Sequence, residues 1–257
     1  MCELLGASSS VARSYSRWLA AFRSRGGQAA DNPDGWGVAF WPGGKALIEK
    51  SPEPGWNSPR LAALTGRADS TLVIAHVRKA RHPPVPGFLN THPFAHACCG
   101  QEWVFAHNGL VPVVAGCAAA CHPKGETDSE VAFCRLLAGI AGDYDSLDHG
   151  HWIARLAQVA SEIASSGKFN FLLSDGHLLV AYGHDRLHYL EKSSGRVLLA
   201  MVSTQPITDD DWREFAPGEL RVYRDGALLA CHVPQWRTRV SPGLPGFDQQ
   251  QHPGETA

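Results

Sequence analysis

A cysteine stands at the second position of the chain, directly after the initiator methionine. Removal of Met1 would leave Cys2 as the N-terminal residue, with a thiol and a free α-amine on one residue. A thiol is only weakly ionised at neutral pH and needs a nearby base to act as a nucleophile. The α-amine, with an unperturbed pKa of roughly 7.7–8.0, is suited to that task near pH 7. Cys2 could therefore supply both a nucleophile and its base.

An asparagine-glycine pair, Asn108-Gly109, follows a predicted strand. The Asn108 side-chain amide and the Gly109 backbone N–H could converge on one point, which is what the oxyanion of a tetrahedral intermediate requires. The same dipeptide is also a strong signal for the tight turn of a β-hairpin. The pair alone leaves both an oxyanion hole and a turn open.

Two charged residues could hold the ends of an amino acid. Arg78 closes an apolar run and could bind a carboxylate through its planar guanidinium fork, although a surface arginine at a strand end is the alternative. Asp128 stands at the start of a predicted helix, where capping is the ordinary role of an aspartate. A buried aspartate there could also bind an ammonium.

The bulk composition excludes several classes of protein. The chain has 257 residues, of which 44% are hydrophobic and 19% charged, as in a globular protein with a sizeable core. A net charge of −2 gives no electrostatic basis for binding nucleic acid or an anionic membrane. We expect no signal peptide and no membrane span, which would need about 18 uninterrupted apolar residues. Seven cysteines without a framework spacing predict reduced thiols in the cytoplasm rather than disulfides.

Strands predominate toward both ends of the chain, and two helices lie between them. Thr127 and Glu130 have the spacing of a capping box for a helix to about Ala138, and a second helix is predicted over about 150–165. Strands are predicted at residues 2–8, 38–41, 46–48, 71–75, 103–106, 169–173, 178–182, 220–223 and 227–230, with tight turns at Pro42-Gly43-Gly44, Asp175-Gly176 and Asp225-Gly226. We expect one domain over residues 1–240 and a mobile tail over 241–257. This order indicates two sheets with helices outside them, not alternating β-α units.

Together these segments resemble the class II glutamine amidotransferases, which are N-terminal-nucleophile hydrolases. The resemblance covers about residues 2–232. Its motifs occur in the family's order: Cys2, His76-Val77-Arg78, Asn90-Thr91-His92-Pro93-Phe94, Phe105-Ala106-His107-Asn108-Gly109 and Glu126-Thr127-Asp128-Ser129-Glu130. Two further motifs narrow it to short stand-alone members without a fused synthase domain: Pro33-Asp34-Gly35-Trp36-Gly37 and Phe169-Asn170-Phe171-Leu172-Leu173-Ser174-Asp175-Gly176.

The resemblance implies an α+β fold, a four-layer αββα sandwich, and hydrolysis of a γ-glutamyl amide through a Cys2 thioester. No cofactor or metal is implied. The implied roles are as follows: Asn108 and the Gly109 N–H form the oxyanion hole, Arg78 binds the substrate α-carboxylate, Asp128 binds its α-ammonium, and His92 shapes the pocket. The expected partners are a small γ-glutamyl substrate and, if glutamine is the substrate, a separate ammonia-accepting enzyme.

The resemblance also implies supporting roles close to Cys2. The cation of Arg25 would favour the thiolate. Residues 34–37 would form a turn packed behind the nucleophile, with Trp36 as a structural residue.

One departure from the family concerns the residues after Arg78. Larger members often have Trp-Ala-Thr there, with the threonine hydroxyl touching the substrate carboxylate, whereas this chain has Lys79-Ala80-Arg81. Arg81 could serve a second carboxylate on a γ-glutamyl peptide or conjugate. The alternative is that Arg81 points into solvent.

Three rival functions stay open. The first is a γ-glutamyl peptide or conjugate hydrolase with the same residues, which the lack of a fused synthase domain favours because freed ammonia would have no built-in acceptor. The second is a catalytically silent, regulatory or scaffolding subunit, against which the complete set of site residues argues. The third is a thiol or zinc redox module. Neither Cys117-x-x-x-Cys121-His122 nor Cys98-Cys99 has the four closely spaced ligands of structural zinc.

Overall fold

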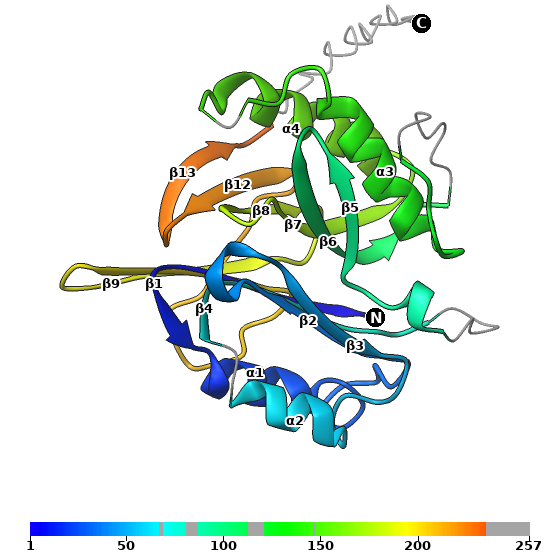
Figure 1. Ribbon diagram of the computed structural model, residues 1–257, viewed down its shortest axis with the longest axis vertical. Coiled ribbons are helices and arrows are strands. Elements are labelled where there is room, and N and C mark those ends of the chain that lie inside the picture. The colour runs from blue at the N-terminus through cyan, green and yellow to red at the C-terminus, as the bar shows by residue number, and fades with distance from the viewer. Residues whose placement is uncertain (67–68, 81–86, 113–120, 146, 235–257) are drawn as a thin grey trace, which may run out of the picture.

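Two antiparallel sheets packed face to face form the centre of the molecule (Figure 1). The computed structural model describes residues 1–66, 69–80, 87–112, 121–145 and 147–234. The first sheet has seven strands in the order β11-β9-β10-β1-β4-β2-β3. Their bounds are β1 (Glu3–Ser14), β2 (Trp36–Phe40), β3 (Leu47–Ser51), β4 (Asp69–Val77), β9 (His188–Ser194), β10 (Val197–Ser203) and β11 (Arg213–Glu214).

The second sheet has six strands in the order β13-β12-β8-β7-β6-β5. Their bounds are β5 (Phe94–Cys98), β6 (Gln101–Leu110), β7 (Lys168–Ser174), β8 (Leu178–Gly183), β12 (Glu219–Arg224) and β13 (Ala227–His232). The pairing of β12 with β13 confirms the predicted hairpin. Its turn residues Asp225 and Gly226 have φ values of 50° and 76°, the left-handed backbone that tight hairpin turns use.

Helices cover the outer face of each sheet, which gives four layers (Figure 1). The helices α1 (Ser16–Ser24) and α2 (Pro59–Thr65) pack Trp18, Phe22 and Leu61 into the core of the first sheet. On the other side, α3 (Asp128–Ile140) and α4 (Gly150–Ala164) share an apolar core with the second sheet. A third core fills the space between the sheets, and its fully buried members include Leu4, Ile74, Val104, Leu172 and Val202. The predicted αββα sandwich is confirmed.

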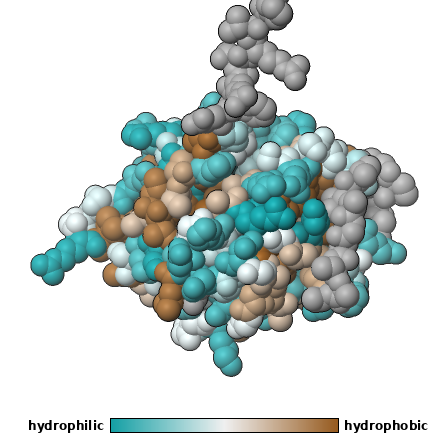
Figure 2. Space-filling view, turned by 90° about the horizontal axis from the view of Figure 1, so that it is seen from above, coloured by the Kyte–Doolittle hydropathy of each residue, from teal (hydrophilic) through white to brown (hydrophobic). Residues whose placement is uncertain are grey.

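The helices in the part of the chain that the structure describes do not have the character of membrane spans. None of them combines the length and the apolar character that crossing a bilayer demands. The face seen from above mixes hydrophilic and hydrophobic residues (Figure 2).

The predicted elements are correct in type, and the predicted strands are shorter than the observed ones. The strand predicted at 2–8 is β1, which runs on to Ser14 with a register shift between Ser8 and Arg13. The helices α1 and α2 and the strands β5, β9, β10 and β11 were not predicted. Two 3₁₀ turns complete the elements, at Pro42–Gly44 in the predicted β2–β3 hairpin and at Phe88–Asn90 before β5. The predicted tail, 241–257, lies outside the described residues.

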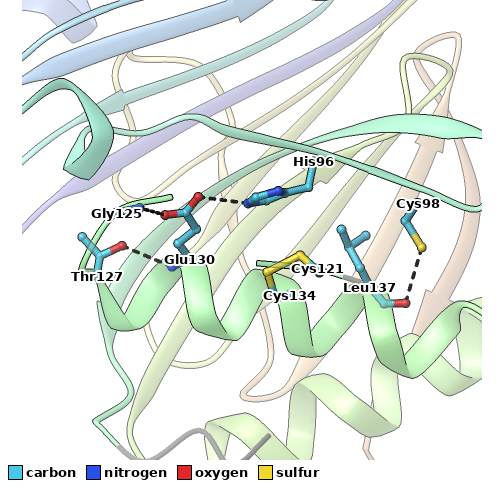
Figure 3. Close-up of a disulfide and its surroundings, with 8 residues drawn as sticks. All are labelled: His96, Cys98, Cys121, Gly125, Thr127, Glu130, Cys134 and Leu137. Atoms are coloured by element: carbon cyan, nitrogen blue, oxygen red, sulfur yellow. Dashed lines mark hydrogen bonds and ion pairs between the residues drawn. A yellow bond between two sulfur atoms is a disulfide. The ribbon is translucent and has the colours of Figure 1, made fainter. Parts of the chain in front are cut away.

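The prediction that all the cysteines are reduced is wrong for one pair. Cys121 and Cys134, 13 positions apart, form a disulfide that ties the loop before α3 to that helix (Figure 3). Four cysteines in the described part of the chain are free: Cys2, Cys98, Cys99 and Cys231. Within the described ranges, His96 and the two bonded sulfurs lie within 4.8 Å of one another, but sulfurs bonded to each other are not thiolate ligands. Cys117, the partner proposed for Cys121 in a zinc module, lies outside those ranges.

Candidate active site

Strand pairing places Cys2 beside the segment that follows β4. In the first sheet β1 lies between β10 and β4, and Glu3 pairs with Val77 in antiparallel register. The Cys2 Sγ accepts a hydrogen bond from the Lys79 N–H at 3.2 Å and lies 3.4 Å from the Lys79 carbonyl oxygen. The sheet register therefore brings Cys2 and Arg78 together.

Burial controls the protonation of the Cys2 thiol. It raises the pKa of the thiol above its ordinary value, while the Lys79 N–H, the terminal ammonium of the chain and the Arg78 guanidinium act in the opposite direction. Because burial has the larger effect, the sulfur is a thiol at neutral pH. Attack on a carbonyl therefore needs a base that removes the thiol proton.

Asn108 reaches Cys2 from the opposite sheet. Its Nδ2 donates a hydrogen bond to the carbonyl oxygen of Cys2, and the residue itself is 1% exposed. Asn108 lies inside β6, opposite Asn170 of β7, so the alternative of a hairpin turn at this dipeptide is excluded. An amide has two hydrogens, so the oxyanion role that the resemblance implies for Asn108 would fall to the second one.

Gly109 takes a backbone conformation that other residues rarely adopt. Its φ is 148°, and a Cβ added there would lie 1.9 Å from the carbonyl oxygen of Lys168 and 2.8 Å from His107 Nε2. Only glycine fits this close approach of β6 to the start of β7. The Gly109 N–H is thus held next to Asn108.

A cavity of about 310 Å³ collects the predicted residues. Five of the six predicted site residues line this cavity: Cys2, Arg78, His92, Gly109 and Asp128. The sixth, Asn108, contacts the lining residue Cys2 through its hydrogen bond. The structure therefore brings together all six residues that the sequence singled out.

The helix α3 presents Asp128 to this cavity from its first turn. Its Oδ2 accepts a hydrogen bond from the Val111 N–H at 2.8 Å, which links the helix to the chain that follows β6. The helix is capped by Thr127, whose Oγ1 accepts from the Glu130 N–H at 3.2 Å. The predicted capping box is only half formed, because the Glu130 carboxylate binds the Gly125 N–H and His96 instead (Figure 3).

The prediction of a turn over residues 34–37 behind Cys2 is wrong for its second half, because Trp36 and Gly37 belong to β2. The first half holds the chain after β4: the Arg78 N–H donates to the Gly35 carbonyl at 2.8 Å, and the Asp34 carboxylate accepts from the Ala80 N–H at 2.7 Å. Trp36 is fully buried in the core of the first sheet, as expected of a structural residue. Arg78 is itself only 7% exposed, so its side chain is fixed before a substrate arrives.

Arg25 has a different role from the one that the resemblance implied. Its guanidinium is engaged by both carboxylate oxygens of Glu3 and by the Gln205 side chain. It therefore anchors the residue after Cys2. The cations that lower the pKa of the thiol are the terminal ammonium and Arg78.

Three buried histidines line or back the cavity. The rings of His76 and His92 are 4.2 Å apart between centroids, and His107 Nδ1 bonds the Ser129 hydroxyl at 2.8 Å. Burial lowers the pKa of His76 to about 3 and that of His92 well below its usual range. Among the described residues neither ring nitrogen of His92 has a hydrogen-bond partner. His92 thus lines the cavity as a neutral ring whose two nitrogens are inaccessible to solvent.

These neutral histidines predict a loss of stability in mild acid. Since the pKa of His76 is about 3 in the folded chain and about 6.5 in the unfolded one, only the unfolded chain gains its proton near pH 5. Between pH 7.5 and 5 the free energy of unfolding should fall by about 2 kcal/mol through His76 alone. His92 and His107, whose pKa values are also lowered by burial, act in the same direction.

Urea unfolding at a series of pH values measures this effect. A His76→Asn variant should show a shallower dependence between pH 7 and 5 than the wild type, by up to about 1.4 kcal/mol per pH unit. Equal slopes for the two proteins would contradict a neutral buried His76.

Comparison with known proteins agrees with this geometry. Residues 1–196 and 191–242 match the family model of the class-II glutamine amidotransferases. The chain belongs to this family. It is 33% identical over 251 residues to "Putative glutamine amidotransferase YafJ" of Escherichia coli (strain K12), a match that spans 87% of this chain and 97% of that protein.

Two other relatives show the range of the family. A gamma-glutamyl-hercynylcysteine sulfoxide hydrolase of Mycobacterium tuberculosis (strain H37Rv) is 27% identical over 184 residues, 70% of each chain. The crystal structure of a predicted glutamine amidotransferase from Pseudomonas aeruginosa PA01 superposes with a TM-score of 0.66 at 27% identity, over 89% of this chain and 100% of that one. The four-layer fold of this chain is that of the N-terminal-nucleophile class II glutamine amidotransferases.

Asn170 is a residue of this amidotransferase site to which the sequence analysis gave no role. It is fully buried, and its Nδ2 lies 3.2 Å from both Oδ1 and the carbonyl oxygen of Asn108. Its Oδ1 accepts from the backbone N–H groups of His184 and Asp185 at 2.8 and 3.0 Å. Asn170 therefore fixes which way the Asn108 amide points.

Lys50 is a second residue that the sequence analysis missed. Its Nζ donates to the carbonyl oxygens of Thr91 and Pro93, at 2.6 and 3.2 Å, on either side of His92. Burial lowers the pKa of Lys50 to about 8. Arg81, the departure from the family pattern, lies outside the described residues.

Proposed function

We propose that the chain hydrolyses a γ-glutamyl amide bond through a thioester on Cys2. The observation that carries the proposal is that Cys2, Arg78 and Asp128 share one cavity of about 310 Å³. A guanidinium and a carboxylate in that cavity complement the α-carboxylate and the α-ammonium of a γ-glutamyl group. Binding these two charges leaves the γ-carbonyl as the group to meet the sulfur.

The first half of the reaction forms the thioester. The α-amine of Cys2, free once Met1 is removed, takes the thiol proton, and the sulfur attacks the γ-carbonyl carbon. Asn108 Nδ2 and the Gly109 N–H stabilise the oxyanion. The resulting ammonium then gives its proton to the leaving nitrogen as the carbon–nitrogen bond breaks.

The second half regenerates the enzyme. The same amine takes a proton from water, whose oxygen attacks the thioester carbonyl in the same oxyanion hole. The carbon–sulfur bond breaks, the sulfur regains a proton, and glutamate leaves. The raised pKa of Cys2 is consistent with this cycle, because the resting thiol keeps its proton until the amine accepts it.

Glutamine is the simplest substrate, and its products would be glutamate and ammonia. A separate ammonia-accepting enzyme belongs to the proposal only in that case. We also propose the cytoplasm as the location, since four of the six cysteines in the described ranges are free thiols, as a reducing compartment favours; the Cys121–Cys134 disulfide is the exception. Release of glutamate by the wild type and its absence in a Cys2→Ala variant tests the proposal. A catalytically silent subunit would release none in either form.

Removing the Arg78 guanidinium should lower kcat/KM to the same extent on every γ-glutamyl substrate. Each presents the same α-carboxylate, and losing a charge-assisted pair worth about 1.5–3 kcal/mol lowers kcat/KM by roughly 10- to 150-fold. Asp128→Asn should act similarly through the α-ammonium. Initial rates on glutamine and on γ-glutamyl dipeptides measure both effects.

Arg60→Ala is the matched control for this loss of an arginine. Its guanidinium pairs with Glu49 on the surface, and 63% of its side chain is exposed. The control should keep the wild-type kcat/KM. An Arg78→Ala variant that also keeps it would show that Arg78 does not hold the substrate.

A further inference from the structure

A second cavity, of about 520 Å³, adjoins the first at Cys2. The two share six lining residues: Cys2, Lys79, Ala80, Gly109, Leu110 and Pro112. Neither Arg78 nor Asp128 lines the second cavity, which is completed instead by Met1, by Ser166 and Gly167 between α4 and β7, and by Lys168 at the start of β7. The nucleophile and the oxyanion-hole glycine thus lie on the boundary between two spaces.

The position of Met1 indicates which part of a substrate each space takes. Met1 lines the second cavity and not the first, and it is bonded to the nitrogen of Cys2. The amine that its removal uncovers therefore faces the second cavity. Because that amine must protonate the leaving nitrogen, the leaving group has to lie on the same side.

The walls of the second cavity define the chemistry of that leaving group. Leu110, Pro112 and Ala80 give it apolar surface, and the ammonium-bearing residues Lys79 and Lys168 also line it. Their Nζ atoms lie 2.7 Å from Asp31 and 2.6 Å from Asp185 in solvent-accessible ion pairs. Exposed pairs of this kind are weak, so either ammonium can turn to a carboxylate that enters. Ammonia would use almost none of this space.

We propose that the second cavity binds the leaving group of a γ-glutamyl peptide whose second residue has an apolar side chain and a free carboxylate. This inference rests on the proposed function and names its substrate class. The γ-glutamyl group occupies the cavity of Arg78 and Asp128, and the scissile nitrogen lies at the Cys2 amine. Hydrolysis then releases glutamate and an apolar amino acid.

The test compares γ-glutamyl-leucine with glutamine. The wild type should have the higher kcat/KM on γ-glutamyl-leucine, by about 10-fold or more, the scale on which an apolar pocket discriminates. Ser166→Phe places a ring in the second cavity. It should lower the ratio of kcat/KM on γ-glutamyl-leucine to kcat/KM on glutamine by about 10-fold or more. Ser165→Phe is the matched control, since Ser165 is exposed and lines a different hollow between α4 and the chain after β13, and it should keep the wild-type ratio.

Each outcome decides between the two proposals. If the wild-type kcat/KM on glutamine equals or exceeds that on γ-glutamyl-leucine, the leaving-group site is overturned and the proposed function still stands. An equal loss of kcat/KM on both substrates in the Ser166→Phe variant would have the same meaning. If Ser166→Phe does not fold, the wild-type preference alone decides. Hydrolysis of neither substrate by the wild type would contradict the proposed function itself.

Discussion

Replacing Cys2 with alanine should abolish hydrolysis of every γ-glutamyl substrate. In the proposed mechanism the thiol forms the thioester, and removing the nucleophile of a covalent enzyme costs on the order of 10⁶-fold in kcat. The variant should still fold, because the neighbouring backbone of β1 keeps its pairing with β4. Glutamate release and a thermal unfolding curve measured on the same preparation check both statements.

The other free cysteines provide the control. Cys98, Cys99 and Cys231 are not among the residues that line the catalytic cavity, so their alanine variants should turn over substrate at the wild-type rate. Full activity in Cys2→Ala would contradict the assignment of the nucleophile. Loss of activity in Cys98→Ala or Cys99→Ala would instead favour a thiol redox function.

Asn108→Ala should lower kcat by roughly 10²–10³-fold and change KM little. The reason is that its amide is used mainly when negative charge develops on the carbonyl oxygen. Steady-state kinetics on glutamine or γ-glutamyl-leucine measures the two parameters. A raised KM with an unchanged kcat would show that Asn108 binds substrate and does not stabilise the oxyanion.

Asn32→Ala is a matched control for this loss of a buried amide. Asn32 is 1% exposed, and its Nδ2 donates to the Arg25 carbonyl at 3.0 Å, but it is not among the residues that line the catalytic cavity. We expect Asn32→Ala to reduce stability and to retain kcat. An equal loss of kcat in both variants would trace the Asn108 effect to the fold.

Motifs at strand ends allowed much of the site to be predicted. Arg78 follows a strand of apolar residues, and the antiparallel pairing of β1 with β4 then brings it to Cys2. Asn170 could not be assigned in this way. Its position in a buried strand carries no sign of its role until the β6–β7 register sets it opposite Asn108.

One of the elements that the sequence did not predict, α1, lacks local signals. The helix α1 has only nine residues, and its N-cap residue, Tyr15, makes no side-chain cap hydrogen bond. Such a helix forms because Trp18 and Phe22 are buried against the first sheet, which is a tertiary effect. The disulfide was missed for a similar reason. Only the folded loop brings Cys121 and Cys134 to a Cα separation of 5.3 Å.

The central claim is that an N-terminal Cys2 carries the acyl group, and intact-mass spectrometry during turnover tests it most directly. The active protein should begin at Cys2, and an acid quench should reveal one added γ-glutamyl group on its N-terminal peptide. A fully active protein that retains Met1, or an acyl group on another residue, would contradict the claim.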